Sequence, residues 1–366
     1  MLYDLRRVFD HKKVLVTGHT GFKGAWLTLW LQILGAKILG YALEPPTDPN
    51  LFSLTLIKDN IQHVIGDIRD FDKLSRVLKD FQPDLIFHLA AQSLVRLSYK
   101  EPKLTYETNI MGTINLYEAV RQATSVRAIV TVTSDKCYEN QEWCYNYREC
   151  DPMGGYDPYS SSKGCVELIA AAYRNAFFNT AGIALASVRA GNVIGGGDWA
   201  EDRLIPDCVR SLAKGKPIEI RNPKAIRPWQ HVLEPLSGYL WLGDLMLQNG
   251  EKYNEGWNFG PEDSDILTVE EVVRQVIQHW GTGQYVIDTL KHPHEASLLK
   301  LDISKARFKL KWQPVYDIFK AIQETVHWYR LYYDNAPGEV IESFTRKQIE
   351  DYIEAARKEK ISWSVN

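Results

Sequence analysis

Three glycines near the start of the chain constrain its fold more than any other feature. Gly18, Gly21 and Gly24 directly follow the apolar run 13–17 and open an apolar segment that continues to residue 33. A strand, a glycine turn and a helix start together leave free backbone N–H groups that a pyrophosphate can approach closely. In this context the spacing Gly-x-x-Gly-x-x-Gly predicts a dinucleotide-binding unit, although a plain strand–turn–helix also fits it.

Strand and helix patterns alternate through the first half of the chain. Short apolar runs at 37–42, 64–65, 85–92, 127–133 and 183–189 are separated by helical patterns. The run 85–92 is continuously apolar, which is typical of a strand buried on both faces. The alternation predicts an α/β fold with a Rossmann-type, doubly wound parallel sheet.

The character of the chain changes after residue 189, where glycines at 195–197 and recurring prolines replace the alternation. We therefore expect a dinucleotide-binding Rossmann domain at 1–188, with 228–257 returning to it. Residues 189–227 and 258–366 are expected to form a smaller C-terminal α/β lobe that binds the substrate. The tail 340–357 has helical spacing and predicts a docked amphipathic helix.

Composition excludes several classes of protein. The net charge of −3 over 366 residues lacks the basic excess of a nucleic-acid-binding domain. No apolar run reaches the ~18 residues of a membrane span, and the first residues lack the apolar core of a signal peptide. The five cysteines contain no Cys-x-x-Cys spacing, so neither a metal site nor a disulfide framework is predicted. We expect a cytoplasmic protein.

Chemistry is expected where the fifth strand ends and where the next helix begins. Ser134, Asp135 and Lys136 follow that strand, at the sheet edge where parallel sheets bind ligands. Tyr159 and Lys163 come after Pro158 and fall on one helical face. An ammonium group favours the phenolate, so the pair could accept a proton. By itself the pair also fits an ordinary solvated helix surface.

The second strand lacks the acidic residue that normally binds the adenosine ribose. Tyr41 lies near its end and Glu44 comes only later. No arginine stands there to favour a 2′-phosphate, so NAD is the expected cofactor. Asp67 could bind the adenine amino group, or it could serve only as a turn and helix cap.

Together these motifs resemble the extended short-chain dehydrogenase/reductase family, and within it the sugar-nucleotide 4,6-dehydratases that act on CDP-glucose. The residues that the resemblance implies for NAD binding are Gly18, Thr20, Gly21, Phe22, Lys23, Gly24, Asp67, Ile68, Leu89, Ala90, Ala91, Asn109, Tyr159 and Lys163. Those that it implies for the sugar nucleotide are Gln92, Arg189, Asn192, Arg203, Arg227, His294 and Glu295.

The resemblance also implies a reaction, a step in making deoxysugar precursors of O-antigen lipopolysaccharide. Tyr159, aided by Lys163 and Ser134, takes the C4 hydroxyl proton while hydride passes to NAD. Water then leaves across C5 and C6 with Asp135 as the acid, and the hydride returns to C6. The product is CDP-4-keto-6-deoxyglucose, and a homodimer or homotetramer is implied.

Lys136 departs from the pattern of this group, which carries Glu at that position. A lysine near pKa ~10.4 must be lowered by roughly three units to act as a base at neutral pH. Lys136 is therefore either the C5 base or a cation that stabilises the enolate. Two other functions stay open: a nucleotide-sugar 4-epimerase or reductase of the same family, and a non-catalytic cofactor sensor.

Overall fold

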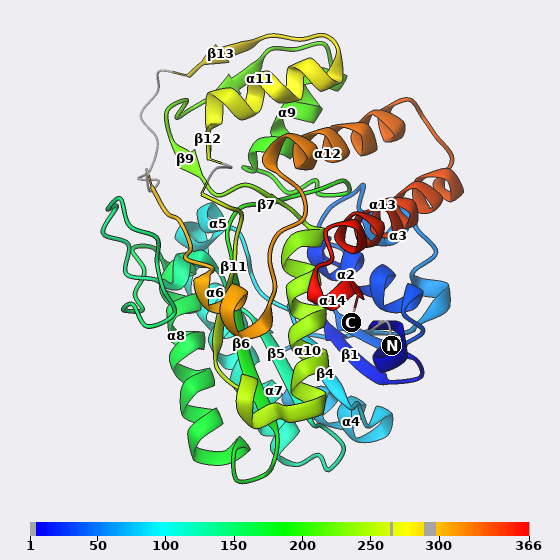
Figure 1. Cartoon of the computed structure of the whole chain (residues 1–366), viewed down its shortest axis with the longest axis vertical. Helices are drawn as coiled ribbons and strands as arrows, with labels where there is room; N and C mark the ends of the chain where they lie inside the picture. The colour runs from blue at the N-terminus through cyan, green and yellow to red at the C-terminus, as the bar shows by residue number, and fades with distance from the viewer. Residues whose placement is uncertain (1–4, 264–265, 289–297, 366) are drawn as a thin grey trace.

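A seven-stranded parallel sheet forms the centre of the protein. In the computed structural model, which describes residues 5–263, 266–288 and 298–365, the strand order is β11-β6-β5-β4-β1-β2-β3. Every neighbouring pair is parallel. The strands are β1 (Lys13–Thr17), β2 (Lys37–Ala42), β3 (Gln62–Ile65), β4 (Leu85–His88), β5 (Ala128–Val132), β6 (Ala184–Ala190) and β11 (Gly256–Phe259). The predicted Rossmann-type α/β fold is confirmed (Figure 1).

Helices cover both faces of the sheet because successive strand residues point to opposite sides. Leu85 and Phe87 of β4 belong to one core and Ile86 to the other. The first core contains helices α2 (Phe22–Ile33) and α10 (Leu233–Tyr253). The second contains α4 (Phe71–Phe81), α7 (Gly112–Arg121) and α8 (Pro158–Tyr173).

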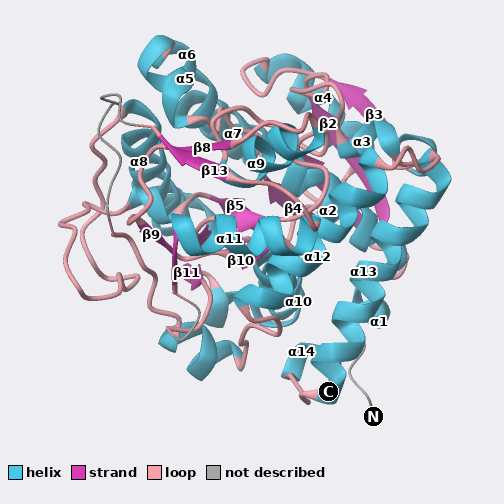
Figure 2. Ribbon diagram, turned by 90° about the horizontal axis from the view of Figure 1, so that it is seen from above, coloured by secondary structure: helices cyan, strands magenta, loops and turns pink. Residues whose placement is uncertain are grey.

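A second lobe lies beyond the carboxyl ends of the strands (Figures 1 and 2). Its strands pair two by two: β7 (Val193–Ile194) with β10 (Gln230–His231), β8 (Ile218–Ile220) with β13 (Tyr285–Ile287), and β9 (Ile226–Arg227) with β12 (Leu267–Thr268). Its helices include α9 (Leu204–Ala213), α11 (Val269–Trp280) and α12 (Ile318–Tyr333). Thr268 and Glu271 form a reciprocal capping box at the start of α11.

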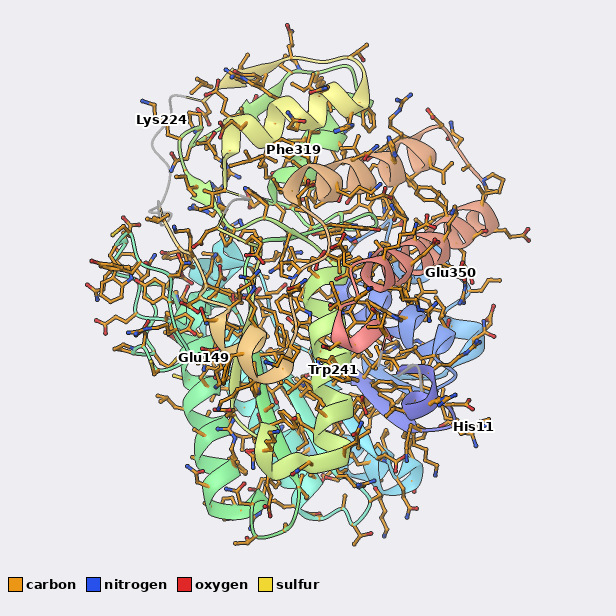
Figure 3. The ribbon with its side chains drawn as sticks, viewed as in Figure 1. His11, Glu149, Lys224, Trp241, Phe319 and Glu350 are labelled. Atoms are coloured by element: carbon orange, nitrogen blue, oxygen red, sulfur yellow. The ribbon has the colours of Figure 1, made fainter. Side chains whose placement is uncertain are left out.

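Shorter helices and turns complete the described chain. The α-helices are α1 (Leu5–Phe9), α3 (Leu51–Leu54), α5 (Val95–Lys100), α6 (Pro102–Tyr106), α13 (Gly338–Lys358) and α14 (Ser362–Val365). The tighter or wider turns are η1 (Lys58–Asn60), η2 (Glu107–Met111), η3 (Asp135–Cys137), η4 (Arg174–Phe178) and η5 (Ala306–Leu310). Trp241 of α10, labelled in Figure 3, donates from Nε1 to the Leu310 carbonyl at 2.7 Å and so ties α10 to η5.

Two observations bear on the predicted domain boundaries, which stay a prediction. Strand β6 continues past residue 188 to Ala190, and β11 continues past residue 257 to Phe259. Helix α13 contacts α12 of the second lobe, where Trp328 Nε1 donates to Thr345 Oγ1 at 2.8 Å, and α13 and α14 also reach the Rossmann domain. They pack on α2, where the Trp30 ring meets the edges of Tyr352 and Trp363 at centroid distances of 5.7 and 6.0 Å. The tail packs on α2 because this contact buries its large aromatic side chains Tyr352 and Trp363.

Candidate active site

The glycine turn after β1 brings strand β4 and helix α2 unusually close together. Gly18 has φ +77°, and a Cβ on it would lie 2.7 Å from the Ala90 backbone nitrogen. A Cβ on Gly24 would lie 2.1 Å from the Gly18 carbonyl oxygen. No larger residue fits either position, and the turn leaves the start of α2 open toward the carboxyl ends of the strands.

A cavity of about 1500 Å³ lies above this turn, between the sheet and the second lobe. It brings together most of the residues that the sequence nominates. Those lining it are Gly18, Thr20, Gly21, Phe22, Lys23, Gly24, Asp67, Ile68, Leu89, Ala90, Ala91, Gln92, Ser134, Asp135, Lys136, Tyr159, Lys163, Asn192, Arg203 and Arg227.

Helix α8 places Tyr159 and Lys163 at the cavity wall. Asp157 caps the helix by accepting the Ser160 N–H at 2.9 Å, and Pro158 occupies the first helical position, as predicted. Gly164 lets the helix approach the Gly154 carbonyl, since a Cβ there would lie 2.5 Å from it. The two functional side chains are consequently buried one turn apart, with exposed fractions of 8% and 5%.

Ser134 and Asp135 lie beside the Tyr159 phenol at the end of β5. Ser134 Oγ donates to Asp135 Oδ1 at 2.9 Å, and Ser134 also forms a side-chain hydrogen bond with Tyr159. Asp135 is only 3% exposed. Its other oxygen, Oδ2, has no hydrogen-bond partner among the described residues. A buried, unpartnered carboxyl oxygen in a cavity is costly unless a ligand group meets it.

Burial controls the pKa values of both α8 side chains. It raises the pKa of Tyr159 to about 12, while the bond with Ser134 and the charge of Arg203 act in the opposite direction. It lowers the pKa of Lys163 to about 8, against the opposing effect of Glu167. Lys163 Nζ donates to the Val132 carbonyl at 3.3 Å. Ser134 and Arg203 are thus two groups that favour the phenolate, and the contribution of Lys163 stays a prediction.

Lys23 reaches from the glycine turn to the catalytic groups. Burial lowers its pKa to about 7, the charges of Arg203 and Lys163 lower it further, and Asp135 raises it. Lys23 therefore lines the same cavity as Asp135 and Lys163, and the charges of both act on its ammonium group.

Similar proteins identify the family of this chain. A sequence profile described as GDP-mannose 4,6 dehydratase matches residues 15–325. The chain belongs to this dehydratase family. A CDP-glucose 4,6-dehydratase from Salmonella typhimurium is 52% identical over 359 residues, which cover 96% of this chain and 99% of the relative. A dTDP-glucose 4,6-dehydratase from Xanthomonas campestris is 28% identical, covering 86% and 92% of the two chains.

A solved structure agrees with the placement in this family. The dTDP-glucose 4,6-dehydratase of Bacillus anthracis, determined in complex with NAD, superposes with a TM-score of 0.74. The two sequences are 26% identical, and the match covers 88% of this chain and 98% of the other.

Tyr41 occupies the place where an acidic ribose ligand was sought. Its buried hydroxyl donates to the Asp67 carbonyl at 2.9 Å, and its ring packs against Gly66. The Asp67 carboxylate lines the cavity and binds Arg69 at 2.6 Å. This hydrogen bond is the main reason that the pKa of Asp67 lies below its usual range. Asp70, not Asp67, caps the following helix, so Asp67 is not the cap residue.

Two residues predicted to bind ligands, Arg189 and Asn109, bond to other parts of the protein and do not line the cavity. Arg189 is 4% exposed, pairs with Glu167 and does not line the cavity, so its position does not support the predicted contact with the sugar nucleotide. Asn109 is 1% exposed and clamps Gln92 by accepting from its N–H at 2.8 Å and donating to its carbonyl at 3.0 Å. It acts through Gln92 rather than by lining the cavity. His294 and Glu295 lie outside the described residues.

The sequence reasoning missed ion pairs that bridge the cavity wall. Asp202 binds Arg96 of α5 and Arg221 of the second lobe, each at 3.1 Å. Asp198 binds Arg203 at 2.7 Å. Apart from Arg203, which the family resemblance nominates, these residues carry no motif, because each is an ordinary surface charge until the second lobe folds over the sheet.

Two further observations concern other kinds of site. None of the helices that the structure describes is both long enough and apolar enough to cross a membrane. Within residues 5–263, 266–288 and 298–365, no group of three or more His, Cys, Asp or Glu side chains could hold a metal ion.

Proposed function

We propose that this chain converts CDP-glucose to CDP-4-keto-6-deoxyglucose by removing one water, with NAD as a cofactor that is regenerated in each turnover. The observation that carries this proposal is the buried Asp135 carboxyl beside Ser134 and Tyr159. Hydride transfer at C4 needs only a base such as Tyr159. A second buried proton carrier has a task only if a hydroxyl must also leave.

The residues present fit a dinucleotide. The glycine turn has no room for side chains at Gly18 and Gly24, and the start of α2 faces the cavity. When bound, NAD supplies an acceptor and later a donor of one hydride. Lys23 and Lys163 line the same cavity and would hold the cofactor there.

The proton transfers fall to this chain's own side chains. Tyr159 takes the proton of the C4 hydroxyl as C4 is oxidised to a ketone. The ketone acidifies the C5 proton, and Asp135 protonates the departing C6 hydroxyl as water. Lys136 lines the cavity next to Asp135 and is assigned to C5, either as the base or as the cation that stabilises the enolate. Reduction at C6 and return of a proton to C5 then give the 4-keto-6-deoxy sugar and restore the balance of electrons and protons.

The choice of CDP-glucose rests on the relative from Salmonella typhimurium named CDP-glucose 4,6-dehydratase. Arg227 and Arg203 line the cavity and are proposed diphosphate ligands, because guanidinium groups match phosphate oxygens with parallel bonds. Asn192 and Gln92 are proposed sugar ligands on the same grounds of position.

We further propose that the chain forms a homodimer or homotetramer in the cytoplasm. Leu168 on α8 is 62% exposed and Met111 beside α7 is 49% exposed, which supports pairing through these helices. All five cysteines are free, as expected in a reducing compartment. Light scattering of the purified protein measures the oligomeric state, and a monomer would contradict the first statement.

The function is tested by turnover of CDP-, dTDP-, UDP- and GDP-glucose, read from the alkali-induced absorbance of a 4-keto sugar. We expect CDP-glucose to be preferred. Asp135→Asn should lower elimination by about 10²–10⁴-fold, yet still oxidise C4 and accumulate reduced nicotinamide. Asp80→Asn, on the exposed end of α4, serves as the matched control. A wild-type protein that yields only a 4-epimer would identify the rival epimerase and contradict the proposal.

A further inference from the structure

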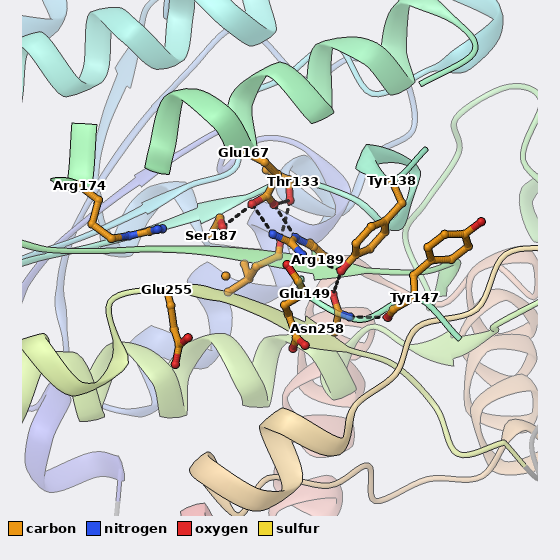
Figure 4. Close-up of polar contacts among 12 residues, drawn as sticks. Thr133, Tyr138, Tyr147, Glu149, Glu167, Arg174, Ser187, Arg189, Glu255 and Asn258 are labelled. Carbon is orange, nitrogen blue, oxygen red and sulfur yellow. Dashed lines mark hydrogen bonds and ion pairs between the residues drawn. The ribbon is translucent and has the colours of Figure 1, made fainter. Parts of the chain in front are cut away.

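A fully satisfied buried carboxylate lies behind the active site, on the same helix as Tyr159 and Lys163. Glu167 of α8 is 5% exposed and accepts four hydrogen bonds (Figure 4). Oε1 accepts from Thr133 Oγ1 at 2.5 Å and from Arg189 Nε at 2.9 Å. Oε2 accepts from Ser187 Oγ at 2.5 Å and from Arg189 Nη2 at 2.7 Å. The carboxylate thus joins α8 to strands β5 and β6.

The network continues from Arg189 to strand β11 and to the segment around residue 302. Arg189 Nη1 donates to the Tyr138 hydroxyl at 2.6 Å, and that hydroxyl donates to Asn258 Oδ1 at 2.7 Å. Asn258 Nδ2 in turn donates to the carbonyls of Tyr147 and Asp302, at 2.8 and 3.1 Å. Buried side chains therefore connect α8, β6, β11 and the segment around residue 302.

Segment 133–138, which carries Ser134 and Asp135, is bound at both ends to the ion pair of Glu167 and Arg189. Thr133, bound to Glu167, directly precedes Ser134, and Tyr138, bound to Arg189, comes two residues after Lys136. Ser134, Asp135 and Lys136 lie between the two attachments. The buried ion pair alone is weak grounds for stability, because desolvation offsets most of its attraction. Its position suggests a use in geometry instead.

Glu167 also lies one helical turn after Lys163 and faces it as a negative charge. The other groups that bear on Lys163 are the Cys137 thiol of η3, His88 of β4 and Lys23 of α2. Burial raises the pKa of Cys137 well above its usual value and lowers that of His88 to about 3, so both are neutral. Although burial opposes it, Arg189 holds the pKa of Glu167 below its usual range. Glu167 is therefore the anion that stabilises the Lys163 ammonium.

We propose that Glu167 and Arg189 are a positioning pair for the dehydration: they hold segment 133–138 in register with Tyr159 and Lys163, and Glu167 is the counter-charge of Lys163. The inference rests on the proposed function. It assigns no contact with substrate to either residue.

The test compares Glu167→Gln with the wild type. The amide keeps the shape and removes the charge, so the pKa of Lys163 should fall by about one unit. Lys163 then loses its proton at a lower pH, and the alkaline limit of kcat should move down by about one pH unit while KM changes little. Glu167→Asp, which retains the charge, should restore the alkaline limit. Glu234→Gln, another buried carboxylate on α10, is the matched control and should leave the limit unchanged.

A second readout needs no turnover. Acetic anhydride labelling across pH, with peptide mass spectrometry, gives the protonation midpoint of Lys163. Glu167→Gln should lower that midpoint by about one unit. Absence of turnover in the wild type would contradict the proposed function, while this shift would still support the pair. A folded Glu167→Gln protein with wild-type midpoint and wild-type pH profile would overturn the inference.

If Glu167→Gln does not fold, Tyr138→Phe tests the geometric part. It breaks the link from Arg189 to Asn258 and leaves the charges in place. We expect kcat to fall about tenfold with an unchanged alkaline limit. The loss of one buried hydrogen bond that holds the segment in place changes an equilibrium by up to about that factor. An unchanged kcat would contradict the positioning role.

Discussion

The Tyr159 phenol must release its proton before it can take one from a substrate, and burial opposes this by raising its pKa to about 12. Ser134 and Arg203 act against burial. Ser134 donates to Asp135 Oδ1 while bonded to Tyr159, so one hydroxyl connects the proposed base to the proposed acid. The two proton carriers consequently cannot be varied independently.

Ser134→Ala should raise the pKa of Tyr159, because the bond it removes favours the phenolate. A base with a higher pKa is less ionised at neutral pH, so C4 oxidation should slow there by about 10–100-fold and recover as pH rises. Single-turnover reduction of nicotinamide across pH measures this. Ser75→Ala on α4 is the control, and an unaltered pH profile in Ser134→Ala would contradict the assignment.

Among the elements, helix α8 depends most on its own first turn. Asp157 accepts both the N–H and the hydroxyl of Ser160, at 2.9 and 2.6 Å, and Tyr159 lies between them in the chain. The cap therefore fixes the start of the helix and the direction of the phenol. Helix α4 has a comparable cap, where Asp70 accepts the Lys73 N–H at 3.0 Å, but it carries no functional residue.

These two caps allow a matched comparison. Asp157→Ala and Asp70→Ala should each lower the free energy of unfolding by about 0.5–2 kcal/mol, measured in urea. Only Asp157→Ala should also lower kcat, because only that helix presents Tyr159. Equal activity in the two variants, at equal stability, would show that the cap does not position the phenol.

At the scale of the whole molecule, the C-terminal tail connects parts that are far apart in sequence. Trp363 is 1% exposed and lies against Trp30 of α2 and Tyr352 of α13. The Tyr352 hydroxyl donates to Glu234 Oε2 at 2.7 Å, and Glu234 also accepts from the backbone N–H of Tyr316 at 2.8 Å. The tail thus secures the first helix of the Rossmann domain to α10 and to the approach of α12.

Trp363→Ala should cost about 3–5 kcal/mol of stability, as expected for removing a buried tryptophan. Trp143, which is 39% exposed, provides the control, and Trp143→Ala should cost much less. Thermal unfolding of both variants measures the difference. Similar melting temperatures would mean that the tail docks without contributing to the fold.

Much of the fold and part of the site could be predicted from short-range sequence patterns. The glycine turn and the alternation of patterns predict a parallel sheet, and a parallel sheet brings its strand ends to one edge. Ser134, Asp135, Tyr159 and Lys163 meet there for that reason alone. The family resemblance then supplied their roles.

Sequence alone determined which backbone segments meet, because period, turn chemistry and glycine spacing act over a few residues. Tertiary structure decided where individual side chains go. Arg189 turns to Glu167 instead of the cavity because a buried guanidinium must find a carboxylate. The Tyr41 hydroxyl donates to the Asp67 carbonyl because a buried hydroxyl needs an acceptor. The tail packs on α2 because its aromatic side chains are buried against Trp30. A buried polar side chain needs a hydrogen-bond partner. That partner is often far away in the sequence, so a short-range pattern cannot predict it.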